Sequence, residues 1–227
     1  MLLKHLSKQN FYVILQLKVG IPMTITNNHF DDIMKNRRSI RKYKEVEITD
    51  HTIKAIFELA LRAPSANNLQ PWTFRVIKSK AAKDQFSHLF KWNRSQYETS
   101  SAMIIVLVDT RFASRAPQIY DKAVSQGSMS IEVRDRQLEN FKKQNPNPLD
   151  VLKTAYLDAG LVAMNIMLTA RSFGYDTCPI GGFDRLNAPL AFGLENHEAV
   201  MAISIGVADD FGNNSVRLDF DQVGQIH

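Results

Sequence analysis

Arginines gather at one point of the sequence, with a serine among them. Arg37, Arg38, Ser39 and Arg41 stand within one short segment, and Arg217 supplies a further cation near the end of the chain. A guanidinium binds phosphate oxygens through a two-pronged fork, and a hydroxyl adds one more donor. These residue types predict a phosphate site. Dibasic segments are also common on solvated surfaces, which is the alternative interpretation.

A loop rich in amides and prolines is the second candidate. Residues 63–72 read Ala-Pro-Ser-Ala-Asn-Asn-Leu-Gln-Pro-Trp. Proline fixes φ, while asparagine tolerates irregular backbone and offers both hydrogen-bond donors and acceptors. Such a loop is stiff and can present amides to a flat, polar ligand. Considered alone, an ordinary helix-to-strand connection would be the preferred interpretation.

The third candidate lies at residues 177–184, which read Thr-Cys-Pro-Ile-Gly-Gly-Phe-Asp. The pair Gly181 and Gly182 removes both Cβ atoms where a planar ligand could lie against backbone N–H groups. Cys178 precedes a proline in this motif, and we interpret it as a small packed residue rather than a nucleophile.

Other common catalytic motifs are missing from the sequence. No G-x-G-x-x-G motif follows a predicted strand, so a Rossmann site for NAD is not supported, and there is no Walker phosphate loop. His51, His88 and His197 lack the spacing of metal ligands, and we interpret them as surface or structural residues. No serine stands in a nucleophile elbow.

Composition points to one enzyme-sized domain in a reducing compartment. The chain has 227 residues, of which 44% are hydrophobic, enough for a sizeable core. The single cysteine excludes an intrachain disulfide. No run approaches the ~20 consecutive apolar residues of a membrane span. We therefore expect a cytoplasmic protein.

The first 22 residues differ from the rest. Lys4, Lys8 and Lys18 stand there without an acid and contribute +3 of the formal net charge of +5. The basic balance therefore says little about the remaining chain, and a nucleic-acid partner is not supported. No small-residue cleavage site follows, so we do not expect a secretory signal. Because Met23 follows, we interpret residues 1–22 as an extension that is either disordered or non-native, the product of an upstream translation start, and 23–227 as the single domain.

Hydrophobic periodicity, together with the glycines, prolines and capping residues that end each segment, predicts the helices and strands that carry these motifs. The predicted helices span 30–36, about 50–62, 80–90, 115–126, 129–143 and 149–173, and the predicted strands span 73–78, 103–108 and 199–207. Thr49 or Asp50 caps the second helix and Gly174 ends the last one. The strand 103–108 is apolar on both faces, which predicts a central strand covered on both sides. The order lacks a βαβ repeat and indicates an α+β layered fold.

Taken together and in this order, the motifs resemble the FMN-dependent nitroreductase family. The resemblance runs from about residue 30 to the C-terminus and includes the helix 160–171 and the sequence Gly-Tyr-Asp-Thr at 174–177. It is nearest to bacterial NAD(P)H nitroreductases. It implies a nitroreductase-like layered fold with a central mixed sheet flanked by helices. It also implies a homodimer with FMN sites at the subunit interface, onto which about 217–227 of each chain wraps.

The resemblance also assigns residues to the cofactor. Relatives use matching positions for the phosphate, the ribityl chain and the pyrimidine edge, and the backbone at 179–182 passes the dimethylbenzene and N5 side. The residues at 64–68 approach the flavin from the neighbouring subunit. The implied catalytic groups are Arg41 over the pyrimidine edge and the Gly181 N–H toward N5. The implied cofactor-binding set is Arg37, Arg38, Ser39, Arg41, Pro64, Ser65, Ala66, Asn68, Asn93, Gln96, Pro179, Ile180, Gly181, Gly182 and Arg217.

Three positions depart from the family pattern. Gln96 stands where several relatives have lysine, Ser215 where lysine is frequent, and Gly181 where many have glutamate. Each of the first two removes a cation, so the flavin potential cannot be taken over from the family.

The function implied is that of an NAD(P)H oxidoreductase with a ping-pong mechanism and an electron-poor acceptor such as a nitroaromatic or quinone. The missing catalytic motifs agree with this function, since a flavin performs hydride transfer and the protein binds and orients it. Alternatives on the same fold are an enone or quinone reductase, reductive dehalogenation, flavin-consuming chemistry and a flavin-binding regulatory module without turnover. The sequence does not identify the physiological acceptor or a preference between NADH and NADPH.

Overall fold

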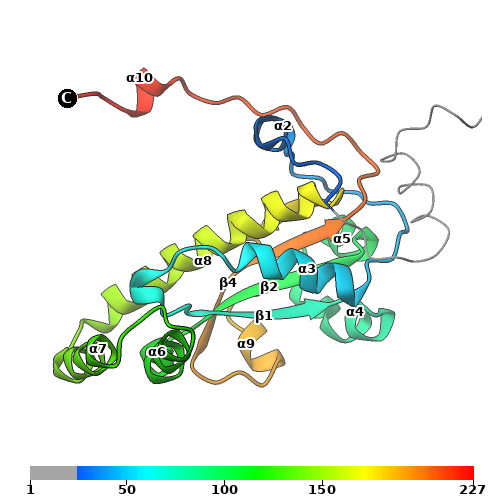
Figure 1. Ribbon diagram of the computed structural model, residues 1–227. Helices are drawn as coiled ribbons and strands as arrows, with labels where there is room; N and C mark the ends of the chain where they lie inside the picture. Colours follow the sequence, from blue (N-terminus) through cyan, green and yellow to red (C-terminus); the bar gives the residue numbers. More distant parts are fainter. Residues whose placement is uncertain (1–24) are drawn as a thin grey trace, which may run out of the picture.

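The computed structural model describes residues 25–227, so the predicted extension 1–22 lies outside the described residues. Figure 1 shows the arrangement of the elements. The strands are β1 (Trp72–Ile77), β2 (Ala102–Asp109), β3 (Asp176–Ile180) and β4 (His197–Gly206). The helices are α2 (Phe30–Asn36), α3 (Asp50–Ala60), α4 (Lys80–Phe86), α5 (Arg94–Thr99), α6 (Ala116–Ser125), α7 (Ile131–Lys143), α8 (Pro148–Ser172), α9 (Ala188–Ala191) and α10 (Phe220–Val223).

The four strands form one sheet in the order β1-β2-β4-β3, and each neighbouring pair is antiparallel. The sheet that we expected to be mixed is therefore antiparallel among the described strands. Parallel pairing there is limited to an isolated bridge between Ser39 and Thr177. That bridge places the segment with the arginines beside β3, at one edge of the sheet. The predicted α+β layered fold is confirmed.

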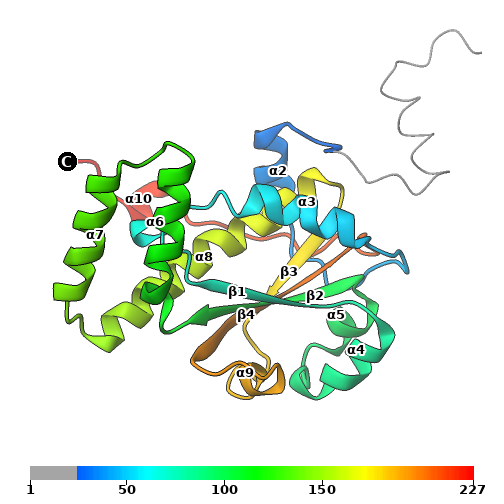
Figure 2. The same cartoon turned by 60° about the horizontal axis from the view of Figure 1, so that its bottom comes forward.

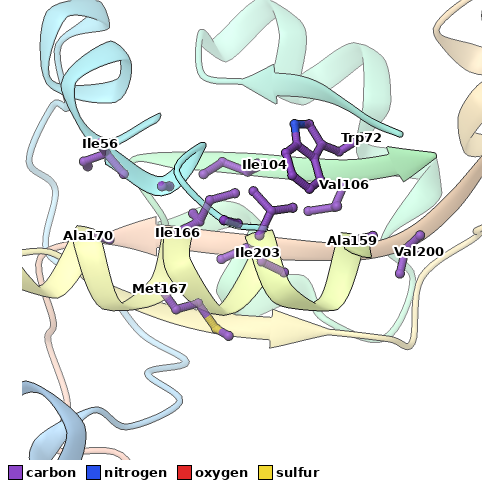
Figure 3. Close-up of a cluster of buried hydrophobic side chains, with 14 of the residues drawn as sticks. Ile56, Trp72, Ile104, Val106, Ala159, Ile166, Met167, Ala170, Val200 and Ile203 are labelled. Atoms are coloured by element: carbon purple, nitrogen blue, oxygen red, sulfur yellow. The ribbon is translucent and has the colours of Figure 1, made fainter. Parts of the chain in front are cut away.

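Strand β2 lies at the centre of the molecule and is buried on both faces, as predicted. Its side chains alternate, so Ile104 and Val106 face one apolar cluster while Met103 and Ile105 face the other. Figure 3 shows part of the first cluster, where Ile166 of α8 lies over the sheet. Figure 2 shows α3 and α8 on one side of the sheet and α4, α5 and α9 on the other.

Helix α8 spans Pro148–Ser172, against the predicted 149–173, and Gly174 follows its end as the sequence indicated. The Asn147 side chain accepts a hydrogen bond from the Leu149 N–H at 2.9 Å, and Gly174 takes a φ of 83° just past the end. Among the described helices, α8 alone is long and apolar enough to cross a membrane, and it packs on the sheet as a core helix. The stretch 156–170 is apolar nearly all round, which predicts burial, but Leu157 and Leu161 are 71% and 48% exposed.

The chain leaves the body of the protein after β4. The segment that follows runs past α2 and away from the sheet, as Figure 1 shows in orange and red. Large apolar side chains along it are exposed: Phe211, Val216, Leu218, Phe220, Val223 and Ile226. This C-terminal arm therefore carries apolar surface that the described protomer does not cover.

Candidate active site

The segment with the arginines is held against the edge strand β3. Arg37 caps the C-terminal end of α2, and two residues later Ser39 forms the isolated bridge with Thr177. The Ile40 N–H donates to the Thr177 carbonyl at 3.1 Å, and the Ile40 side chain is only 3% exposed. A backbone bond and a buried anchor therefore fix the positions of the charged residues on either side.

Three guanidiniums meet here, and within residues 25–227 none of them forms an ion pair with an acid. Burial, and then the positive charges of Arg217 and Arg38, lowers the pKa of Arg37 from its ordinary value. The Arg37 Nη1 atom is buried and has no hydrogen-bond partner in the described structure. A buried donor of this kind is costly unless something accepts from it. The cluster Arg37, Arg38 and Arg217 therefore fits an anionic group such as a phosphate.

Arg41 lies at the exposed end of the same segment. Its main chain is fixed from two sides, because its N–H donates to Asp210 Oδ2 at 3.3 Å and its carbonyl accepts from Ser95 Oγ at 2.8 Å. Among residues 25–227, its guanidinium donates to the Ser39 carbonyl alone, at 3.3 Å. The side chain thus keeps most of its donors free for a ligand, on a backbone that is held in place.

Gln96 of α5 and Asn93, which directly precedes that helix, come to the same place. The Asn93 Nδ2 atom donates to the Gly182 carbonyl at 2.7 Å, and Gln96 Nε2 lies 3.4 Å from Asn93 Oδ1. Gln96 is buried, with 8% exposed. These contacts join the start of α5 to the Gly pair after β3. A Cβ added at Gly181 would meet no heavy atom within 4 Å, so open space lies over this backbone. Pro179 and Ile180 precede it at the end of β3.

Cys178 lies between these segments and is 4% exposed. Burial raises the pKa of its thiol, and the charge of Arg41 and hydrogen bonds from Ser39 and Gln96 offset that only in part. The thiol is therefore held in the neutral form, which is the weaker nucleophile. Its neighbours show that the arginine segment, α5 and β3 converge on one place.

The amide loop at 64–68 lies in another part of the protomer. Asp158, in the middle of α8, accepts from the Ala66 N–H at 3.1 Å, and the Tyr120 hydroxyl donates to the Asn67 carbonyl at 3.1 Å. Ser65 Oγ accepts from the Gln70 N–H at 3.0 Å. These contacts anchor the loop to α8 and α6 rather than to β3.

The backbone of this loop is unusual. Asn67, Asn68 and Gln70 have φ values of 51°, 57° and 48°. Residues with a side chain rarely adopt this left-handed conformation, and such residues persist where the surroundings hold them. Pro64 and Asn68 are exposed at the surface of the loop. The loop is therefore rigid, strained and open to solvent on one side.

Within the protomer, the predicted residues thus form two separate groups. The first group consists of Arg37, Arg38, Ser39, Arg41, Asn93, Gln96, Pro179, Ile180, Gly181, Gly182 and Arg217, and the second of Pro64, Ser65, Ala66 and Asn68. In both Figure 1 and Figure 2 the loop between α3 and β1 lies toward α6, while the segment after α2 lies near β3 and α5. The described protomer does not bring them together.

Asp158 is a residue that we did not predict from the sequence. It is 5% exposed, and burial raises its pKa, with the Ala66 N–H lowering it in part. The signal was a carboxylate inside the apolar helix 149–173, which would be costly without a partner. The sequence alone did not reveal that the partner is the loop.

The chain matches known proteins over most of its length. The family model described as "Nitroreductase family" matches residues 34–207. YdgI of Bacillus subtilis, whose name places it among the NAD(P)H nitroreductases, is 44% identical over 88% of this chain and 99% of its own. The enone reductase of CLA biosynthesis from Lactiplantibacillus plantarum is 31% identical over 86% of this chain and 93% of its own.

Solved structures agree with the sequence matches. A nitroreductase from Exiguobacterium sibiricum, crystallised in complex with FMN, superposes with a TM-score of 0.86 and 42% identity, covering 89% of this chain and 99% of that one. The fold, the site and these matches place the chain in the nitroreductase family, and the protein is an oxidoreductase of that family.

Proposed function

We propose that this protein is an FMN-dependent NAD(P)H oxidoreductase of the nitroreductase type. The observation that carries the proposal is the buried Arg37 Nη1 atom without a partner, set among Arg38 and Arg217 beside the open backbone at Gly181. One terminal phosphate is the anion that this cluster fits, which favours FMN. The FMN-bound relative at 42% identity supports the same cofactor.

The residues of the first group would hold the cofactor in a defined order. Arg37, Ser39 and Arg217 would bind the phosphate, with Arg38 near the ribityl chain. Arg41, Asn93 and Gln96 would bind the pyrimidine edge, and the backbone 179–182 would lie along the other edge. When bound, FMN supplies hydride and electron transfer.

The chain contributes charge and backbone donors to that chemistry. Arg41 keeps most of its donors free, and its charge would stabilise negative charge on the pyrimidine side of a bound FMN. The Gly181 N–H would orient toward N5. Gln96 is neutral where several relatives have lysine, so Arg41 carries a larger share of the positive charge. NAD(P)H would deliver its hydride and leave before the acceptor occupies the same open face, which is a ping-pong mechanism.

The assembly that we propose is a homodimer. Residues 25–227 leave apolar side chains exposed on the face of α8 with Leu157 and Leu161 and along the C-terminal arm at 211–226. Exposed apolar surface of this extent is typical of an interface. A second copy would cover it and would bring its loop 64–68 to the FMN of the first. We propose a cytoplasmic enzyme with no nucleic-acid partner.

The acceptor class that we favour is a nitroaromatic, a quinone or a similar electron-poor compound. The second candidate is an enone, which is favoured by the 31% identity to a protein named as an enone reductase. A flavin-binding regulatory module without turnover belongs to a different class of function.

Two measurements test the proposal. Flavin released from the purified protein by acid should run as FMN on chromatography, and anaerobic NADPH or NADH should bleach its visible absorbance. Steady-state turnover across nitroaromatics, quinones and enones then ranks the acceptors. Release of FAD, or no flavin binding after reconstitution, would refute the cofactor. Bound flavin that NAD(P)H does not bleach would favour the regulatory module.

A further inference from the structure

A cavity of about 730 Å³ lies beside the loop 64–68, on the side that faces α6. Pro64 and Asn68 of the loop form part of its wall, together with Gln118 and Lys122 from α6 and with Arg62, which follows α3. Its volume is in the range of small-molecule sites. The cavity therefore begins at the loop that, in the proposed dimer, reaches the flavin of the partner.

The lining of this cavity is cationic. Arg62, Arg115 and Lys122 contribute to it, and none of its lining residues is acidic. Arg115 has partners already, since it pairs with Asp109 at 3.3 Å and donates to the Gln70 carbonyl at 2.7 Å. Its guanidinium is therefore already engaged in contacts within the protomer.

Arg62 and Lys122 are different. Both side chains are exposed, and neither forms an ion pair or a side-chain hydrogen bond within residues 25–227. Amides add neutral donors close by, from Asn68, Gln118 and Gln126. Two free cations and several amides around one hollow suit a ligand with phosphate oxygens, which accept from both kinds of donor.

We propose that this cavity binds the phosphates of the NAD(P)H donor, through Arg62 and Lys122 of the subunit that contributes loop 64–68. The inference rests on the proposed function and deepens it, because it names where the nucleotide part of the donor lies. The chain has no Rossmann motif to hold a dinucleotide. The cavity supplies the cations that such a donor needs, next to the place where its nicotinamide would meet the flavin. The phosphate chemistry is common to the pyrophosphate of both donors and the 2′-phosphate of NADPH.

The test compares donors with and without phosphates. The variants are Arg62→Ala, Lys122→Ala and the double variant, with Arg136→Ala plus Lys142→Ala as the matched control on exposed positions of α7. Each holoenzyme is assayed with NADPH, with NADH and with 1-benzyl-1,4-dihydronicotinamide, which carries no phosphate. Thermal unfolding and FMN content confirm that each variant is folded.

The double variant should raise the KM for NADPH about tenfold, because two exposed pairs between a side-chain cation and a phosphate are lost. The kcat with NADPH and the KM for the benzyl donor should stay unchanged. The control variant should leave every KM unchanged. In the wild-type enzyme the KM for NADPH should rise with salt, and less so in the double variant. An equal effect on NADH and NADPH assigns the cations to the pyrophosphate, and a larger effect on NADPH assigns them to the 2′-phosphate.

Two outcomes overturn the inference. One is an unchanged KM for both nucleotides in a double variant that is folded and loaded with FMN. The other is a rise in the KM for the benzyl donor equal to that for the nucleotides, or a change in the KM for the acceptor alone. Both differ from a failure of the proposed function, in which the wild-type protein would not turn over with any of the three donors.

Discussion

Replacing Arg37 by methionine should act in opposite directions on the apoprotein and on its FMN complex. In the protein without ligand, Arg37 Nη1 is a buried donor without a partner, and the charges of Arg38 and Arg217 oppose it. Such a donor costs about 1–3 kcal/mol. Arg37 is half-buried rather than enclosed, so the lower end applies. The free energy of unfolding of the apoprotein should therefore stay unchanged or rise by up to about 1 kcal/mol.

FMN binding should suffer from the same change. A hydrogen bond to a charged group contributes about 1.5–3 kcal/mol, so losing one raises the Kd for FMN by about 10- to 150-fold. Bound ligand stabilises a protein according to the ratio of its concentration to its Kd. At a fixed FMN concentration, the stability that FMN adds should fall by about the same 1.5–3 kcal/mol.

The assay is denaturant unfolding of apoprotein and of protein with excess FMN, together with an FMN titration followed by flavin fluorescence. Arg136→Met serves as the control, because Arg136 lies on the exposed side of α7. An unaltered Kd in the Arg37 variant would remove this residue from the phosphate site. An apoprotein destabilised by more than about 2 kcal/mol would show that Arg37 supports the fold itself.

Four further changes have defined outcomes. Cys178→Ser should keep FMN content and turnover, because the thiol is buried and its pKa is raised; complete loss of turnover with normal flavin would favour thiol chemistry. Gly206→Ala should lower the free energy of unfolding by about 1–3 kcal/mol, since the new Cβ would lie 2.8 Å from Tyr43 Cδ1; an unchanged denaturation midpoint would contradict this. Burial raises the pKa of Asp158 above its ordinary 3.8, so the folded protein holds that proton more tightly, and stability should fall as pH rises from about 3.8 through the folded pKa. Asp158→Asn should lack this part of the pH profile, and identical profiles would count against it. Deleting residues 1–22 should preserve FMN content, dimerisation and turnover, as gel filtration and activity will show; a truncated form that loses flavin or becomes monomeric would make the extension part of the fold.

The elements that the sequence predicted are those with strong local signals. The Thr49 side chain caps α3, as expected, by accepting from the Thr52 N–H. Helix α3 ends at Ala60 and α4 at Phe86, earlier than predicted, and a 3₁₀ turn at Ser87–Leu89 follows α4. Strand β3 was not predicted, because Pro179 and the glycines after it read as a loop. A proline is tolerated there because β3 is an edge strand.

In the site, too, residues with a local sequence signal were predicted, and contacts between segments far apart in the sequence were not. Composition and order identified the arginines and the Gly pair, and the structure brings those segments together through the bond from Asn93 to Gly182. Asn93 directly precedes α5, a short helix that has no apolar periodicity to reveal it. The contact of Asp158 with Ala66 joins residues 92 positions apart, and no local pattern encodes such a pair. The cavity between the loop and α6 is likewise a product of tertiary packing.

The separation of the arginine segment from loop 64–68 has a genetic consequence. If each site takes its arginines from one subunit and its loop from the other, two defective chains can repair one another. A chain with Arg37→Met keeps its loop, and a chain with a disrupted Asn68 keeps its arginines. Their mixed dimer holds one site with both parts intact and one with neither. Random association of equal amounts would restore about a quarter of the sites, so two alleles that are each impaired would together recover part of the activity.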